Sequence, residues 1–202
     1  MVDGRAVFFT WTTYGTWLPG DPRGYVSNTL RPDGGYERRH NIPGTPFTRD
    51  DRYTYETAQQ LMSFPPVVLS PTQASWAAEG LIDAARQNGW RIVRAAIMAT
   101  HVHLVVPLAD DKPWWIQKIL KGRSSHYMSG RHGKTWRWWA QGARKDIVSG
   151  DDSMAHVMRY IEDQEHILLR IVDNTIVSEW RARSRPDKFQ VPDPIRGALS
   201  AK

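Results

Sequence analysis

The stretch 99–107 constrains the fold more than any other part of the chain, because it reads Ala-Thr-His-Val-His-Leu-Val-Val-Pro. Its β-branched and apolar residues predict a strand that ends at the proline. Side chains two apart in a strand leave the same face, so His101 and His103 point to one side. The other side belongs to the apolar set Val102, Leu104 and Val106. If that set packs on a core, the two imidazoles stand together on the opposite face.

Two neutral imidazoles on a rigid sheet supply most of a metal site, which commonly takes three protein ligands. The alternative is structural, and for a bare His-x-His pattern it is the more frequent one: two histidines that face solvent or are satisfied by hydrogen bonds. The motif therefore predicts a metal site only if the rest of the chain supplies a third ligand and a reaction.

The segments around this strand predict a sheet with helices. Residues 5–13 are β-branched and aromatic and residues 90–98 are largely apolar, so both are expected to be strands. The link from the second of these to His101 is so short that the two strands can pair only antiparallel. Capping signals and apolar periodicity predict helices at 53–63, 71–87, 113–128 and from about 149 to 168.

The composition points to one domain with an anionic partner. The 202 residues carry a formal net charge of +6 at pH 7, with a pI near 9.7. The sequence shows no run of about eighteen apolar residues, no signal-like start and no basic amphipathic anchor, so we expect a cytoplasmic, nucleoid-associated protein that does not bind membranes. The lack of cysteine excludes disulfides and Cys-ligated zinc.

The strongest charge asymmetry lies in residues 112–145, the basic segment, which holds Lys and Arg but no Asp or Glu. Such a segment suits single-stranded DNA, because cations neutralise phosphates and indole rings stack on bases. The alternative is a solvated basic face over a tryptophan core. The tryptophans expected to stack are Trp136, Trp138 and Trp139, whereas Trp114 is read as an apolar position of the helix at 113–128. The predicted DNA-binding residues are Lys118, Lys121, Arg123, Arg131, Lys134, Arg137, Arg144 and Lys145.

Two parts of the chain do not predict a packed structure. The segment at about 18–70 is rich in Gly, Pro and Arg and is read mainly as a long loop inserted into one domain at 1–180. Residues 181–202 combine charges with prolines and are read as a weakly ordered basic tail.

Tyr160 and Gln164 lie four residues apart in the last predicted helix, so they share one of its faces. Taken alone the pattern is weak, since a tyrosine at the edge of a core and a glutamine in water would also produce it. Joined to His101 and His103 it becomes specific. The amide oxygen of Gln164 is then a neutral third ligand, the phenol is a nucleophile beside the metal, and open positions remain for phosphate oxygens.

These residues resemble the motifs of the single-tyrosine transposases, a family of the histidine-hydrophobic-histidine (HUH) nuclease superfamily. The resemblance covers most of the chain, from Phe8 to about Gln164, and is to the REP-associated tyrosine transposases and the insertion-sequence 200/605 type. Its anchors are Phe8-Phe9-Thr10-Trp11-Thr12-Thr13-Tyr14-Gly15-Thr16-Trp17-Leu18-Pro19-Gly20-Asp21, His101-Val102-His103-Leu104-Val105-Val106, Leu120-Lys121-Gly122-Arg123-Ser124-Ser125 and Met158-Arg159-Tyr160-Ile161-Glu162-Asp163-Gln164.

The resemblance implies a ferredoxin-like α+β fold, with helices packed on a central antiparallel sheet. It implies His101, His103 and Gln164 as ligands of Mg²⁺ or Mn²⁺ and Tyr160 as the nucleophile. The implied substrate is single-stranded, hairpin-bearing DNA, which is cleaved and rejoined through a 5′-phosphotyrosine. Both a monomer and a homodimer remain open.

Two features depart from the family. The REP-associated branch usually carries Asn-Pro after the tyrosine, with Asn at the position of Gln164. This chain has Gln164-Glu165 there, so we expect the helix to continue past it. The segment at 18–70 is longer than in the minimal transposases, and the resemblance gives it no role.

Two other functions fit parts of the sequence. A metal-dependent nuclease that uses activated water would need a carboxylate or a third histidine near His101, and it would not need Tyr160. A hairpin-binding protein derived from a transposase would need no catalysis at all. The sequence determines neither the general base, nor the target DNA, nor whether Tyr160 serves its own subunit or a partner.

Overall fold

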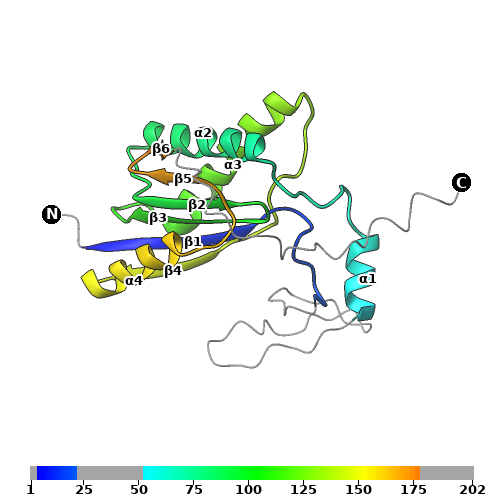
Figure 1. Ribbon diagram of the computed structural model, residues 1–202, viewed down its shortest axis with the longest axis horizontal. Helices are drawn as coiled ribbons and strands as arrows, with labels where there is room; N and C mark the ends of the chain where they lie inside the picture. Colours follow the sequence, from blue (N-terminus) through cyan, green and yellow to red (C-terminus); the bar gives the residue numbers. More distant parts are fainter. Residues whose placement is uncertain (1–3, 22–51, 178–202) are drawn as a thin grey trace, which may run out of the picture.

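The structure is a computed structural model that describes residues 4–21 and 52–177 (Figure 1). Much of the predicted loop at 18–70 and all of the predicted tail at 181–202 lie outside the described residues. Its strands are β1 (Arg5–Thr12), β2 (Arg94–Met98), β3 (His101–Pro107), β4 (Arg144–Ser149), β5 (Ile167–Val172) and β6 (Thr175–Val177). Its helices are α1 (Arg52–Gln60), α2 (Pro71–Gln87), α3 (Pro113–His132) and α4 (Asp151–Glu162). None of these described helices is both long and apolar enough to cross a membrane.

The strands form one antiparallel sheet in the order β4-β1-β3-β2-β5-β6. The first four strands of this order, connected through α2 and α3, have the arrangement of a ferredoxin-like unit, and β5 and β6 extend the sheet beyond β2. Thr12 lies opposite His101, so the histidine end of β3 lies beside the end of β1. The predicted α+β class with a central antiparallel sheet is confirmed.

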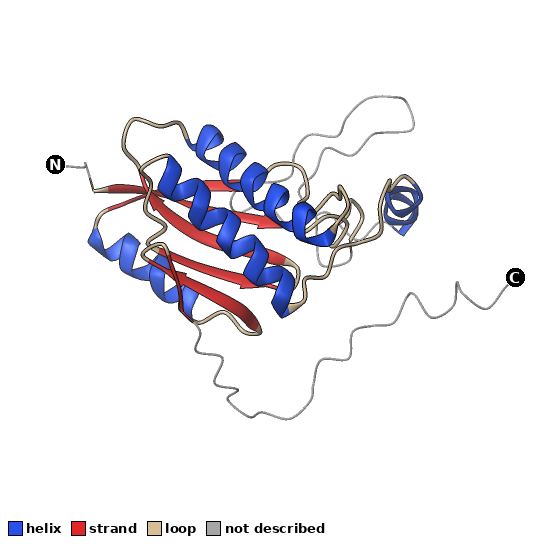
Figure 2. Ribbon diagram, turned by 90° about the horizontal axis from the view of Figure 1, so that it is seen from above, coloured by secondary structure: helices blue, strands red, loops and turns tan. Residues whose placement is uncertain are grey.

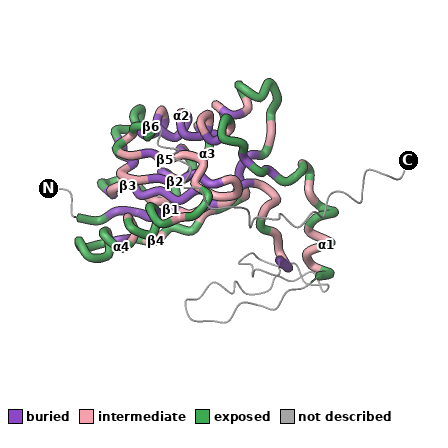
Figure 3. Tube along the Cα trace, viewed as in Figure 1, coloured by how far each residue is buried: buried purple, intermediate pink, exposed green. Residues whose placement is uncertain are grey.

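Helices cover both faces of the sheet (Figures 1 and 2). α2 and α3 lie together on one face, and α4 lies alone on the other. The side chains of β1 alternate between two clusters: Val7 and Phe9 enter the large core under α2 and α3, whereas Ala6 and Phe8 enter a small cluster under α4. Figure 3 shows that burial concentrates in the central strands and α2, while α4 contributes one buried residue, Ile161.

α2 occupies its predicted range because local chemistry fixes its start. Ser70 accepts a hydrogen bond from the backbone N–H of Gln73, and the Gln73 side chain accepts one from the N–H of Ser70. Pro71 takes the first helical position. Further along, Gly80 allows α3 to approach closely, since a Cβ at this position would lie 2.6 Å from the Cα of Ser124.

Some predicted boundaries are wrong. α3 continues to His132 instead of ending near Met128, because Met128 is itself buried and the chain turns only at Gly133, which has a φ of 74°. β2 begins at Arg94 rather than at residue 90. Residues 144–149 form β4, which the sequence analysis did not predict because Arg-Lys-Asp-Ile-Val-Ser carries little apolar alternation.

The last predicted helix is wrong in its extent. α4 ends at Glu162, and residues 167–168, predicted to lie on its apolar face, belong to β5. The last carbonyl groups of α4 have no N–H donor from a following helical turn, and side chains donate to them instead. Gln164 Nε2 donates to the carbonyl of Tyr160, and Arg170 donates to the carbonyl of Glu162.

Candidate active site

His101 and His103 lie side by side on β3, on the face of the sheet that α4 covers. Their ring centroids are 4.9 Å apart. His103 is buried, with 4% of its surface exposed, and His101 is half-buried. As the alternation predicts, the apolar residues between and after them enter the large core on the other face; these are Val102, Leu104 and Val106.

A threonine hydroxyl lies at one ring nitrogen of each histidine. Thr10 Oγ1 is 2.8 Å from Nδ1 of His103, and Thr100 Oγ1 is 3.1 Å from Nδ1 of His101. Thr10 reaches His103 because the two residues are opposite each other in the β1–β3 register. With its proton on Nδ1, each ring donates to the hydroxyl and keeps the lone pair of Nε2, the orientation usual for metal-binding histidines.

Burial favours the neutral form of both imidazoles. The pKa of His103 falls to about 4, mainly through burial and further through the charge of neighbouring His101. Burial also lowers the pKa of His101. A neutral imidazole offers the lone pair that binds a divalent ion, whereas an imidazolium does not. At neutral pH the pair is therefore in the protonation state that a metal site requires.

Tyr160, in the last turn of α4, lies against His103. Its ring centroid lies 5.2 Å from that of His103 and 5.8 Å from that of Phe8, edge-on in both cases. The following residue, Ile161, is the buried anchor of the helix. Tyr160 itself is 45% exposed, so the phosphate of a large substrate can reach its hydroxyl.

Gln164 lies beyond the end of α4, so it does not share a helix face with Tyr160 as predicted. Its Nε2 donates to the Tyr160 carbonyl over 2.9 Å, and its amide oxygen remains an acceptor. The structure thus brings Tyr160 to the histidines and Gln164 to the backbone of Tyr160. Among the described residues it shows no hydrogen bond between Gln164 and either histidine.

The donors present fit a divalent metal ion as two of its ligands. Both imidazoles come from one strand, and the described residues contain no cluster of three or more His, Cys, Asp or Glu side chains. Among the described residues, the amide oxygen of Gln164 is a candidate third ligand, and water or phosphate oxygens would take the other positions. This mixture of nitrogen and oxygen suits Mn²⁺ at least as well as Mg²⁺.

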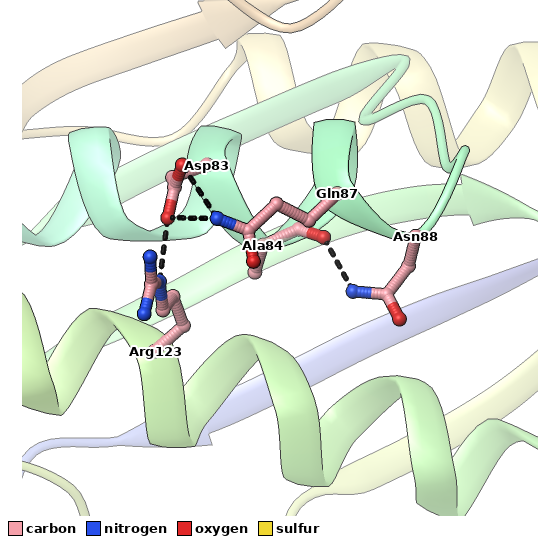
Figure 4. A network of polar contacts seen from close by, with 5 residues as sticks. All are labelled: Asp83, Ala84, Gln87, Asn88 and Arg123. Carbon is pink, nitrogen blue, oxygen red and sulfur yellow. Dashed lines mark hydrogen bonds and ion pairs between the residues drawn. The ribbon is translucent and has the colours of Figure 1, made fainter.

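Two predicted DNA-binding arginines form ion pairs with α2. Arg123 contacts Asp83 over 2.5 Å, and Gln87 donates to the same carboxylate (Figure 4). Arg131 pairs with Glu79 on the same helix. The basic segment contains no carboxylate of its own, yet these guanidinium groups are paired, because the acidic partners come from a helix distant in sequence.

Two further predicted DNA-binding residues also make internal contacts. Lys121 donates to the carbonyls at 140 and 142, and its pKa falls to about 8 because it is buried and lies near Lys145. Arg144 pairs with Asp146 over 2.7 Å. The predicted residues that have no carboxylate partner within the described part of the chain are Lys118, Lys134, Arg137 and Lys145.

The tryptophans predicted to stack on bases are mostly core residues. Trp138 and Trp139 are 2% and 8% exposed, and their indole N–H groups donate to Ser129 and Ser124 on α3. Trp136 is half-buried and packs against the same core. The prediction of a stacking surface at these positions is therefore wrong for Trp138 and Trp139.

The exposed tryptophans lie instead at the start of α3. Trp114, predicted to face the core, is 55% exposed, and Trp115 is 36% exposed. Lys118 Nζ lies 5.5 Å from the ring centroid of Trp115. Neighbouring residues on a helix point about 100° apart, so the adjacent pair already signalled that both indoles could not be buried equally.

Tyr127, the other tyrosine close to the basic residues, lies on α3 and so on the opposite face from Tyr160. Its ring packs against the guanidinium groups of Arg123 and Arg131, at 5.5 and 5.8 Å from the ring centroid. Removing the Tyr127 hydroxyl is therefore a control for removing that of Tyr160.

A shallow depression of about 420 Å³ lies between β4 and α4, with Ile147, Asp152 and His156 among its lining residues. Sequence analysis did not single it out. The two histidines and the tyrosine do not line it, so this hollow and the clustered chemical groups are separate features.

Comparison with known proteins gives limited similarity. No protein-family model matches the chain, and no curated protein matches it. The structure is similar to that of a REP-associated tyrosine transposase bound to a REP hairpin, with a TM-score of 0.43 and 14% identity over 79% of this chain and 66% of that one. It is also similar to a putative transposase from Deinococcus radiodurans R1, with a TM-score of 0.37 and 17% identity over 79% of this chain and 89% of that one. Likeness at this level concerns the fold alone.

Proposed function

We propose that this chain is a metal-dependent endonuclease and strand transferase, which cleaves and rejoins single-stranded DNA at hairpin sites through a 5′-phosphotyrosine. The observation that carries the proposal is an exposed tyrosine, Tyr160, set against the neutral pair His101 and His103. A nucleophilic oxygen beside two metal-binding nitrogens is suited to attack on a phosphodiester. The choice of DNA with hairpins is what the resemblance to the single-tyrosine transposases implies.

In the proposed reaction the phenol oxygen of Tyr160 attacks a DNA phosphorus in line with the departing 3′-oxygen. The bond between phosphorus and tyrosine forms, the bond to the 3′-oxygen breaks, the phenol loses its proton and the 3′-oxygen gains one. The products are a 5′-phosphotyrosine and a free 3′-hydroxyl. Because the adduct keeps one phosphodiester bond for the one that broke, another 3′-hydroxyl can reverse the step and join a new strand.

His101 and His103 would hold Mg²⁺ or Mn²⁺ through Nε2, with Gln164 as the third protein ligand. The ion, when bound, polarises the phosphate and neutralises charge on the departing oxygen. Thr10 and Thr100 orient the imidazole rings through Nδ1. Gln164 follows the end of α4, and its side-chain nitrogen donates to the carbonyl of Tyr160 in the last turn of that helix.

The proposed DNA contacts are the basic side chains that have no carboxylate partner among residues 4–21 and 52–177. Lys118 lies over an exposed tryptophan, and Arg137 lies 6.0 Å from the ring centroids of both Tyr14 and Phe64. Cations beside partly exposed rings suit a backbone whose bases are unpaired and can stack. Double-stranded DNA of the same length should therefore bind less tightly.

The test is covalent trapping. Protein mixed with a labelled single-stranded hairpin and Mn²⁺ should give an adduct that survives boiling in detergent, maps to the peptide containing Tyr160 and releases a strand ending in a 3′-hydroxyl. Tyr160→Phe keeps the ring and its packing but lacks the oxygen, so this variant should bind DNA and form no adduct. Tyr127→Phe is the matched control and should form the adduct normally.

The same experiment separates the alternatives. Cleavage without an adduct, retained in Tyr160→Phe, would mean hydrolysis by activated water. Binding without cleavage would mean a DNA-binding protein. An adduct that maps to Tyr127 would assign the nucleophile to the opposite face of the sheet.

A further inference from the structure

Helix α4, which carries Tyr160, is attached to the sheet by few apolar side chains. Ile161 is the buried residue of α4, and Met154 and Val157 pack only partly against the small cluster below it. One buried and two partly buried side chains remove little apolar surface from water, so apolar packing contributes little to holding α4 in place. The position of Tyr160 relative to His103 therefore depends on other contacts near the end of the helix.

Two arginines of the sheet meet the last residue of α4. Arg94 on β2 pairs with the carboxylate of Glu162, with 3.1 Å between Nη2 and Oε1. Arg170 on β5 donates to the backbone carbonyl of Glu162, also over 3.1 Å. The contact from Arg94 holds the side chain of Glu162, and the contact from Arg170 holds its backbone. Together they restrict both sliding and rotation of α4 on the sheet.

The strand register explains how these contacts serve the tyrosine. Ala96 lies opposite His103 on one side and opposite Arg170 on the other, so the three residues form a row across the sheet. Ala96 is fully buried in the cluster beneath α4. The last turn of the helix spans this row, with Tyr160 at the His103 end and Glu162 at the arginine end.

The surroundings of Arg94 leave part of its guanidinium group without a hydrogen-bond partner. Its side chain is 27% exposed, and its Nε is buried without a hydrogen-bond partner among the described residues. A buried unpaired N–H is unfavourable. A methionine side chain would fill similar space and leave no buried N–H unpaired. Stability alone therefore does not account for an arginine at this position.

We propose that Arg94 and Arg170 are positioning residues, which hold the end of α4 so that the phenol of Tyr160 stays beside His103. This inference rests on the proposed function, because the geometry matters through the attack by Tyr160. It adds that the arginines act through Glu162 and do not touch the DNA.

The first test compares Arg94→Met with Arg91→Met. Arg91 pairs with Asp173 over 3.7 Å at an exposed site away from α4, and so is a matched control. In single-turnover reactions at saturating hairpin DNA, Arg94→Met should lower the rate of adduct formation by about 10-fold or more, because small displacements of a reacting group are costly. The Kd for DNA should not change. Arg91→Met should match the unsubstituted protein in both.

The second test is a charge exchange. Arg94→Glu alone should reduce the adduct rate, and Arg94→Glu combined with Glu162→Arg should restore a large part of it, because the ion pair is re-formed in reverse. The Arg170 contact goes to a backbone carbonyl and survives the exchange. If Arg94 instead contacted a DNA phosphate, the double variant would remain slow and its Kd would rise, which would overturn the proposal.

Amide hydrogen exchange provides a readout that needs no catalysis. Arg94→Met should speed exchange in α4 while leaving α2 unchanged. If the unsubstituted protein forms no adduct, the proposed function fails, and exchange in α4 still decides whether Arg94 holds the helix. If the adduct forms and Arg94→Met reacts at the normal rate, the positioning role is wrong and the proposed function stands.

Discussion

The two faces of the sheet differ in what their side chains do. Under α2 and α3 lies a continuous core that includes Phe9, Leu81 and Leu120, and some cations of α3 pair with carboxylates of α2, as Arg123 does with Asp83. Under α4 lies a small cluster whose members are Ala6, Phe8, Ala96, Met98, Val105, Val148 and Ile161. Polar groups with reactive atoms, two imidazoles and a phenol, stand beside this second cluster.

The difference indicates that one face of the sheet mainly stabilises the fold and the other carries the reactive groups. Burying a neutral imidazole such as His103 at 4% exposure gives less stability than burying an aliphatic side chain of similar size. The fold tolerates these polar groups under α4 because the opposite face of the sheet supplies most of the apolar burial. Substitutions under α2 and α3 should therefore act on stability, and those under α4 on chemistry.

The largest expected effect is on cleavage, from the histidine pair. His103→Ala should reduce adduct formation by at least about 100-fold, because it removes one of the two proposed imidazole ligands. DNA binding should persist, since the unpaired cations are elsewhere. His126→Ala, at an exposed position of α3, is the control and should be active. EDTA should have the same effect as His103→Ala, and cleavage that survives EDTA would remove the metal from the mechanism.

The next effect is on stability and uses one buried residue from each face. Leu120→Ala, fully buried on α3, should lower the free energy of unfolding by about 3–5 kcal/mol. Ile161→Ala on α4 should cost about 2 kcal/mol, which is below that range, because a helix with one buried anchor can settle into the space. Urea denaturation measures both. Equal losses would mean that α4 is as integral to the core as α3.

A smaller effect concerns DNA affinity and compares Arg137, which has no carboxylate partner among the described residues, with Arg123, which has one. Arg137→Gln should weaken single-stranded DNA binding several-fold and reduce the dependence of log Kd on log salt by about 1. Arg123→Gln should change neither, because its guanidinium already pairs with Asp83. Fluorescence anisotropy at several salt concentrations measures this. A salt slope that falls equally for both would show that ion pairing with α2 opens on DNA binding.

The smallest expected effect is the choice of metal. If the two imidazoles are ligands as proposed, Mn²⁺ should support adduct formation at a rate equal to or modestly above that with Mg²⁺, which prefers oxygen ligands. Single-turnover rates at saturating metal decide it. A clear preference for Mg²⁺ would indicate that oxygen ligands dominate the site.

Sequence patterns predicted those features that depend on neighbours along the chain. The cap at Ser70 with Pro71 fixed the start of α2, and the alternation in 101–107 correctly put the histidines on the face opposite the aliphatic core. Patterns failed where distant partners decide. The end of α4 was missed because its carbonyls are satisfied by Gln164 and Arg170, the latter from a strand that follows the helix.

The sequence by itself determined which side chains of residues 101–107 share a face of the strand, because side-chain direction in a strand follows a period of two residues. That was sufficient to pair His101 with His103. Only the tertiary structure decided that Tyr160 would meet His103, since this depends on the strand register and on where α4 docks. The same holds for the basic segment. Asp83 is distant from Arg123 in sequence, so it neutralises the charge of Arg123 only once α2 and α3 pack together. Which cations of the basic segment already have a carboxylate partner is therefore decided by the tertiary structure.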